Sequence, residues 1–448
     1  MKFFPRAIML AFVLGAPQVF AWSNHSFPTY RALEQMPELV NAAPVTVESL
    51  ESFLKAEEKT LEALLASQEA WAAANLDKFP ARPATLAFIA KPERSDDARR
   101  LAFLMALRVA PNSKLALFIQ PDSRNDPSVG NRLPFSAVNT LPEPQNSGYV
   151  FTALKPGDQV APLAVVATAA DEPDYGLDIN LWEDSPSDWG KVYGFGNLPF
   201  GNPALNYSTQ APFHMGFYHE DSILYAAAPF IKRTFPLLRS YQYGSLASLA
   251  FRTGHDYWGW RFTGLSLHYL QDLTQPYHAS LAPGNSTLRL LGANILAMAG
   301  MSGKKDDMVV LLSNRHLALE KYQKELVQNA AAAKVDTAIE KSLRNTDKDR
   351  SYPEWNDSYL RNVVTTQSSA YGPQLVKILV ATMPEQFVSD PSFDFGVKES
   401  GISLVHELSK RDAASRALLD GAIAELLGNF GAHSRISVRG VLKAGIQQ

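Results

Sequence analysis

The segment 264–278 constrains this chain most, because it places ionisable side chains inside an apolar helical pattern. His268 and Asp272 are four residues apart and therefore share one face of a helix, within reach of one ion. The leucines around them predict that this helix is buried. Pro276 ends it and leaves His278 on the turn beyond. The two imidazoles and the carboxylate are a ligand set typical of zinc, although a His and an Asp at this spacing are as often a hydrogen-bonded surface pair.

The N-terminus has the three parts of a secretory signal peptide. Lys2 and Arg6 precede the apolar run 7–14, and a small-x-small cleavage site ends at Ala21. Nothing later in the sequence reaches the roughly 18–20 apolar residues that a membrane span needs. We therefore expect a signal peptide at 1–21 and a soluble mature protein that is secreted or periplasmic.

Charge and cysteine content narrow the possible functions. The formal net charge is −3, and loss of Lys2 and Arg6 with the signal peptide makes it −5. Such a mildly acidic chain lacks the extended basic footprint of a nucleic-acid binder. It has no cysteine, so any metal must be bound by His, Asp, Glu or the backbone. No protein partner is evident.

Helical periodicity covers much of the chain. The expected helices span about 46–76, 256–273, 286–301 and 307–344, with others starting at Asp96 and running over 413–427 to a stop at Gly428. Residues 120–162 are dense in Pro, Asn, Ser and Gly and predict a loop with short strands at most. The aromatic loop 182–218 is expected to pack on the body as a lid, to line a pocket or to touch a lipid interface.

Further possible ligands accompany the 264–278 segment. His316 and Glu320 repeat the His-x-x-x-acid spacing of one helix face. Cleavage after Ala21 frees the amine of Trp22, which can chelate an ion together with its own carbonyl. The candidate metal ligands are Trp22, His25, Asp174, His214, His219, His268, Asp272, His278, His316 and Glu320.

The order of these residues resembles the bacterial trinuclear-zinc phospholipase C family and, less closely, the related zinc-dependent single-strand nucleases. The central motif is Leu265-Ser-Leu-His-Tyr-Leu-Gln-Asp272, followed by Gln275-Pro-Tyr-His278. The segments that carry the resemblance are roughly 22–30, 170–175 and 210–325. The resemblance implies an all-α, multi-helix fold in one domain, 22–448. It also implies large loop and helical insertions at about 80–165 and a helical C-terminal extension.

By position, the resemblance implies three zinc ions. The implied ligands are Asp174, His268, Asp272 and either His214 or His219 for the first ion, His278, His316 and Glu320 for the second, and Trp22, His25 and Asp272 for the third. We favour His214 over His219. Two gaps exceed those of compact family members, because 40 residues separate Asp174 from His214 and 38 separate His278 from His316.

The resemblance also implies an activity, the hydrolysis of phosphatidylcholine-like phospholipids at a membrane surface to diacylglycerol and a phosphorylated head group. Zinc supplies a hydroxide at neutral pH, which suits a phosphodiester. Asp174 is the expected proton acceptor. Tyr175 either lines a choline pocket through cation–π attraction or is an ordinary buried tyrosine. The alternatives are a single-strand nuclease on the same scaffold and an inactive zinc-binding protein, whose metal sites would be closed to water.

Overall fold

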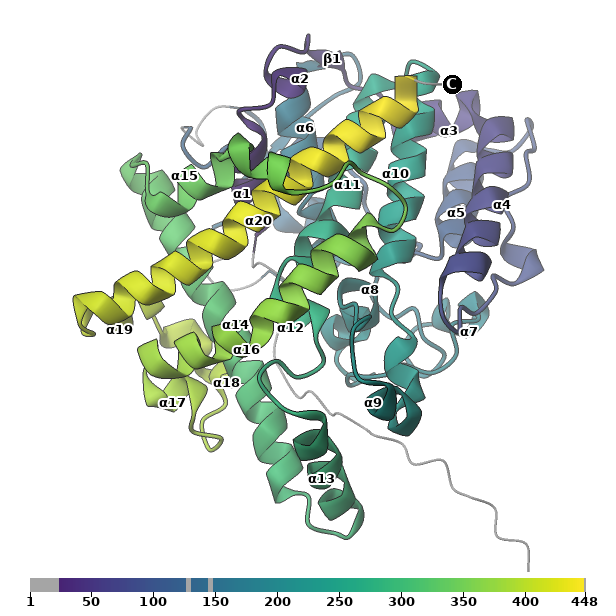
Figure 1. Cartoon of the computed structure of the whole chain (residues 1–448). Helices are drawn as coiled ribbons and strands as arrows, with labels where there is room; N and C mark the ends of the chain where they lie inside the picture. Colours follow the sequence, from purple (N-terminus) through teal and green to yellow (C-terminus); the bar gives the residue numbers. More distant parts are fainter. Residues whose placement is uncertain (1–23, 126–129, 144–147, 447–448) are drawn as a thin grey trace, which may run out of the picture.

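Helix α11 (Asp256–Leu273) forms the buried centre of the fold (Figure 1). All residues from 257 to 273 are buried in the computed structural model, which describes residues 24–125, 130–143 and 148–446. Three helices pack around it: α6 (Pro162–Ala169), α10 (Pro236–Arg252) and α20 (Ala413–Ile446). The buried helix expected at 256–273 is thus confirmed.

Helices dominate the described chain, and a mainly α fold is confirmed. The N-terminal half adds α1 (Ser26–Leu33), α2 (Pro37–Val40), α3 (Leu50–Ala56), α4 (Glu58–Asn75), α5 (Asp96–Leu107), α7 (Gly190–Tyr193), α8 (Ala211–His214) and α9 (Ser222–Ala227). The C-terminal half adds α12 (Pro276–Ala279), α13 (Thr287–Met298), α14 (Gly303–Ala333), α15 (Ala338–Arg344), α16 (Thr365–Thr382), α17 (Glu385–Val388), α18 (Phe395–Lys398) and α19 (Leu404–Ser409).

The strands are short and agree with the loop expected near 120–162. The strands are β1 (Val45–Thr46), β2 (Phe118–Ile119), β3 (Arg132–Leu133), β4 (Phe151–Ala153) and β5 (Gln159–Val160). β1 pairs with β5, and β4 lies between β2 and β3; all pairings are antiparallel. Strands of two or three residues fasten the 118–160 region to itself and to residues 45–46, but they add no separate sheet domain.

Close packing of α6 on α11 depends on a glycine. A Cβ at Gly264 would lie 2.4 Å from the carbonyl oxygen of Val166, so any larger residue would push the helices apart. This close approach brings the end of α6 to the ligand face of α11. There the carbonyl oxygen of Ala170 accepts a hydrogen bond from His268 Nδ1 at 2.8 Å.

The helix stop predicted at Gly428 is wrong. α20 continues without interruption to residue 446 and packs against α1, α10, α11 and α15. A Cβ at Gly428 would lie 2.7 Å from Ser342 Oγ, and one at Gly431 would lie 2.3 Å from the Leu343 carbonyl oxygen. These glycines allow α15 to approach α20, and the packing outweighs their helix penalty of about 1 kcal/mol each.

Two long helices expected from periodicity are each divided. The region 46–76 contains α3 and α4, which meet at Glu57. The region 307–344 contains α14, which starts earlier than expected, and α15. Lys334 ends α14 in a left-handed conformation with φ 52°, and Thr337 opens α15 with a capping box. Neither region contains a glycine or proline, so the sequence carries no breaker signal at these positions.

Aromatic residues of the 182–218 loop pack on the body, in agreement with the first of the three expectations for this loop. Trp182, Phe195 and Phe213 are buried together with Phe235 at the start of α10. Ring centroids of Phe195 and Phe213 lie 5.2 Å apart in an edge-on arrangement. This cluster anchors Phe213 in α8. It therefore also fixes the position of His214, the last residue of that helix.

In the part of the chain that the structure describes, no helix has the length and apolar character needed to cross a bilayer. The signal peptide expected at 1–21 and the candidate ligand Trp22 lie outside the described residues.

Candidate metal centre

Among the described residues, three groups of buried histidine and carboxylate side chains can each hold a metal ion. The groups are His25 with His268 and Asp272, Asp174 with His214 and His268, and His278 with His316 and Glu320. Within each group, the ligand atoms lie within 4.8 Å of one another. Because His268 belongs to two groups, the first two sites adjoin.

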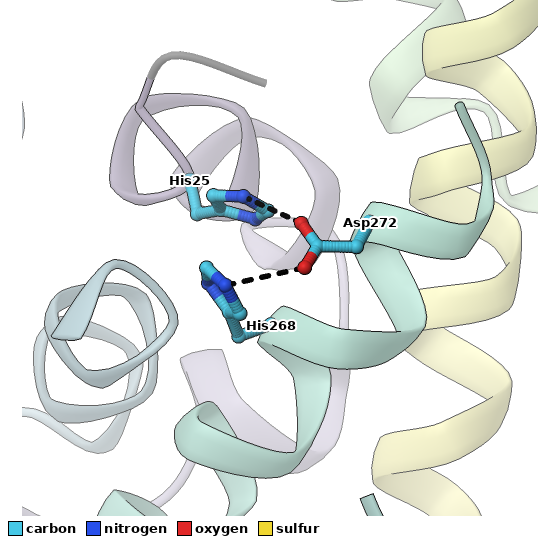
Figure 2. Close-up of side chains that lie close together, drawn as sticks. All are labelled: His25, His268 and Asp272. Carbon is cyan, nitrogen blue, oxygen red and sulfur yellow. Dashed lines mark ion pairs between the residues drawn. The ribbon is translucent and has the colours of Figure 1, made fainter. Parts of the chain in front are cut away.

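The two carboxylate oxygens of Asp272 face different histidines (Figure 2). Oδ1 lies 3.2 Å from His25 Nε2, and Oδ2 lies 3.3 Å from His268 Nε2. Two ligands that are each about 2.0–2.1 Å from one tetrahedral ion are separated by about 3.3 Å. Asp272 Oδ1 is also buried without a hydrogen-bond donor. The carboxylate is therefore placed to serve a cation on each of its sides.

Asp174 and His214 complete the second group from separate elements. Asp174 lies in the 3-10 turn Glu172–Tyr175, and His214 is the last residue of α8. His214 Nδ1 lies 3.0 Å from His268 Nε2 and 2.9 Å from Asp272 Oδ2. Asp174 Oδ1 lies 3.7 Å from His268 Nε2 and has no hydrogen-bond donor. An orphaned carboxylate oxygen beside two imidazole nitrogens fits a bound cation.

The third group joins α12 to α14. His278 Nε2 lies 3.1 Å from His316 Nε2, and Glu320 Oε1 lies 2.7 Å from His316 Nε2 and 3.8 Å from His278 Nε2. The Nδ1–H of His278 donates to the carbonyl oxygen of His214 at 2.9 Å, so its Nε2 carries the lone pair when the ring is neutral. This hydrogen bond also ties the third group to the second.

Burial keeps two of the histidines neutral. It lowers the pKa of His268 to about 4 and the pKa of His278 to about 3, so both rings offer a lone pair at neutral pH. Burial also raises the pKa of Asp174 well above its ordinary value. A cation at the site would offset this cost of burial, because it favours the ionised carboxylate.

Carboxylates raise the pKa of the other two histidines of the adjoining sites. Burial opposes protonation of His25, but the Asp272 carboxylate, whose Oδ1 lies 3.2 Å from His25 Nε2, outweighs burial and raises the pKa to about 9. Burial likewise opposes protonation of His214, while hydrogen bonds to Asp178 and Asp272 raise its pKa to about 10. Metal binding at these rings must therefore displace protons.

Two buried partners that sequence reasoning missed hold His25 in place. Asp171 accepts hydrogen bonds from the His25 backbone N–H at 2.7 Å, from Asn24 at 3.2 Å and from the Tyr175 hydroxyl at 2.6 Å. Gln271 Oε1 accepts from His25 Nδ1 at 2.9 Å. Such outer partners set the orientation of a metal-binding ring. Gln271 lies within the central motif and Asp171 within the segment 170–175, but only the fold shows that both contact His25.

A third missed residue, Asp178, lies behind His214. Its Oδ2 lies 3.5 Å from His214 Nε2 and accepts from the Tyr269 hydroxyl at 2.7 Å. Its Oδ1 accepts from Arg239 Nε at 2.8 Å. Asp178 and Arg239 are fully buried, and the pair connects α10 to His214 of the metal centre.

We expect Arg239→Met to lower the free energy of unfolding by about 3–5 kcal/mol, because it leaves the Asp178 carboxylate buried without its cation. Urea unfolding measures this difference. Arg350→Met is the matched control, because the Arg350–Asp347 pair is exposed, at 86% and 81% for the two side chains. Its loss should change stability by less than about 1 kcal/mol. Equal effects of the two changes would contradict the prediction.

His219 lies outside the three groups. It is exposed, and its Nε2 lies 2.8 Å from the Arg361 carbonyl oxygen and 3.0 Å from Thr365 Oγ1. The sequence leaves His214 and His219 as alternatives for the ion bound by Asp174. The structure brings His214, and not His219, to Asp174. The reason is that Phe213 anchors α8 in the core, whereas the chain has reached the surface at residue 219.

Tyr175 does not present the open aromatic face that a choline pocket needs. Only 2% of the residue is exposed. Its ring packs among Phe118, Phe135, Tyr149 and Phe151. Its hydroxyl donates to Asp171, so the residue contributes to the support of His25. The structure therefore corresponds to the second alternative, a buried tyrosine.

No protein-family model, curated protein or solved structure matches this chain. The three ligand groups themselves therefore support the functional conclusion. Buried imidazole and carboxylate donors, with two orphaned carboxylate oxygens, are consistent with a metalloenzyme.

Proposed function

We propose that the protein is an exported, zinc-dependent phospholipase C that hydrolyses phosphatidylcholine-like lipids. The observation that supports this most is the set of three adjoining His/carboxylate groups, in which Asp272 lies between His25 and His268. The resemblance of the 265–278 motif to trinuclear-zinc phospholipases supports three zinc ions. The signal peptide expected at 1–21 supports export. The acidic mature chain favours a lipid over a nucleic acid.

Each side chain has a distinct part in this proposal. Zinc, when bound, supplies a water of lowered pKa and stabilises the charge that develops on the phosphodiester. Asp272 offsets the charge of two cations. His268 and His278 provide neutral nitrogens, and Asp174 accepts a proton through the carboxylate oxygen that does not bind the cation. The Trp22 amine and carbonyl would complete the ligand set that starts with His25.

A direct test is hydrolysis of phosphatidylcholine and of single-stranded DNA by the same zinc-loaded mature protein. We expect phosphatidylcholine to be cleaved to diacylglycerol and phosphocholine. Asp174→Asn should lower this rate by about 10²–10⁴-fold, the range for loss of a general base. Glu183→Gln, a change outside the three groups, is the control and should leave the rate unchanged.

The other outcomes separate the alternatives. Much faster cleavage of single-stranded DNA than of lipid would replace the phospholipase by the nuclease on the same scaffold. Full zinc content without cleavage of either substrate would favour the inactive zinc-binding protein.

A further inference from the structure

The 37 residues between His278 and His316 contain a projecting helical hairpin. α13 and the first turns of α14 form its two arms, and Figure 1 shows them at the lower edge of the molecule, away from α20. The hairpin connects α12 directly to the helix that carries His316 and Glu320. His316 lies about 20 Å along α14 from Gly303, at about 1.5 Å per residue.

One face of α13 is apolar and exposed. Leu288, Ile295 and Met298 are exposed by 79%, 65% and 62%, and Met301 beyond the helix end by 57%. Their spacing places the three helix residues on one side, while Leu290 and the opposite side pack inward. Monomeric soluble proteins rarely gather large exposed apolar side chains in this way. The face therefore suits a partner.

Charges border this face but do not interrupt it. No residue from 290 to 303 is charged, and the turn 299–303 consists of small residues and Met301. Arg289 and Lys304 are exposed at the two ends of this stretch. Lys305, Asp306 and Asp307 follow on α14, so the local charge is close to balanced, at a net +1. An apolar face with a cationic border is complementary to acyl chains beneath lipid phosphates.

We propose that this hairpin docks the protein on a phospholipid bilayer, with Leu288, Ile295, Met298 and Met301 entering the acyl boundary. This inference rests on the proposed function, because a lipid hydrolase has to reach its substrate in a membrane. The side chains enter only about 5–10 Å, as interfacial helices do, so the turn backbone stays hydrated. Arg289 and Lys304 contact lipid phosphates. The balanced local charge predicts that docking needs no anionic lipid.

A unique fluorescent label tests the docking directly, because the chain has no cysteine of its own. In the Met298→Cys variant, a polarity-sensitive dye is attached to the new cysteine. The emission maximum of the dye should move to shorter wavelength when phosphatidylcholine vesicles are added. The matched control is Leu418→Cys on α20, which is 51% exposed and far along the chain from the hairpin. Its spectrum should not change. An unchanged spectrum at 298 would overturn the inference.

A charge substitution tests the energetics of the same face. Ile295→Glu with Met298→Glu should weaken binding to phosphatidylcholine vesicles by at least about tenfold, because two apolar contacts are lost and two charges gained. The ratio of activity on vesicles to activity on monomeric short-chain phosphatidylcholine should fall by the same factor as vesicle binding. Val40→Glu with Leu418→Glu adds the same charge at other exposed positions and should change neither value.

The remaining outcomes are also decisive. Undiminished vesicle binding of the hairpin variant would overturn the inference while leaving the proposed hydrolysis intact. A shift at position 298 that follows protein concentration instead of vesicles would assign the face to a second copy of the chain. If no phospholipid is cleaved in any form, the proposed function fails, and the vesicle spectra still decide the docking.

Discussion

Asp272→Asn should remove more than one zinc ion from the protein and lower its turnover by well over about 100-fold. The substitution keeps the shape of the side chain but removes the negative charge that faces His25 through Oδ1 and His268 through Oδ2. Loss of an outer partner alone costs about 10–100-fold in affinity or activity. A residue placed between two sites should cost more, because both cations lose a charged ligand.

Zinc content per chain after dialysis, measured by mass spectrometry, checks this prediction together with the rate. Glu340→Gln is the matched control. Glu340 is equally buried, at 1% exposure, but it pairs with Arg124 and caps α15 outside the metal centre. The Glu340→Gln protein should retain its full zinc content. Three ions per chain in the Asp272→Asn protein would contradict a bridging role for this carboxylate.

His214→Ala should abolish turnover, whereas His219→Ala should retain most of it. The ring of His214 lies within 2.9 Å of Asp272 Oδ2 and 3.0 Å of His268 Nε2, so its loss removes a ligand from the adjoining sites. His219 is exposed, and its Nε2 contacts the Arg361 carbonyl oxygen and Thr365 Oγ1, which lie outside the three ligand groups. We expect a loss of at least about 100-fold for His214→Ala and less than about threefold for His219→Ala.

Rates and zinc content of the two variants provide the comparison, and urea unfolding confirms that each is folded. The two histidines are five residues apart, so each variant is a natural control for the other. The reverse pattern would move the ligand to position 219. Equal, high activity in both variants would remove this segment from the centre.

Local pattern was sufficient for the features that depend on neighbours along the chain. The His268/Asp272 and His316/Glu320 pairs follow from the i, i+4 geometry of a helix, and Pro276 accounts for the turn that carries His278. The mainly helical character follows from apolar periodicity in the same way. These features were predictable because one helical turn already brings their atoms together.

Local pattern was misleading where packing decides. Gly428 has the character of a helix stop, but in α20 it permits close contact with α15. The aromatic loop 182–218 was compatible with a lid, a pocket or a lipid surface, and it packs on the body. The apolar exposed face is instead on α13, where periodicity predicted a helix but could not tell which side would lack a partner.

The amino-acid sequence by itself determined which residues are available as ligands and which of them share a helix face. Only the tertiary structure decided that His214, and not His219, meets Asp174, and that Asp171 and Gln271 hold His25. Gln271 is 246 residues from His25 along the chain, so no periodic signal connects them. The physical reason is that helix geometry acts over a few residues, whereas a buried metal centre is assembled by the packing of helices distant in sequence.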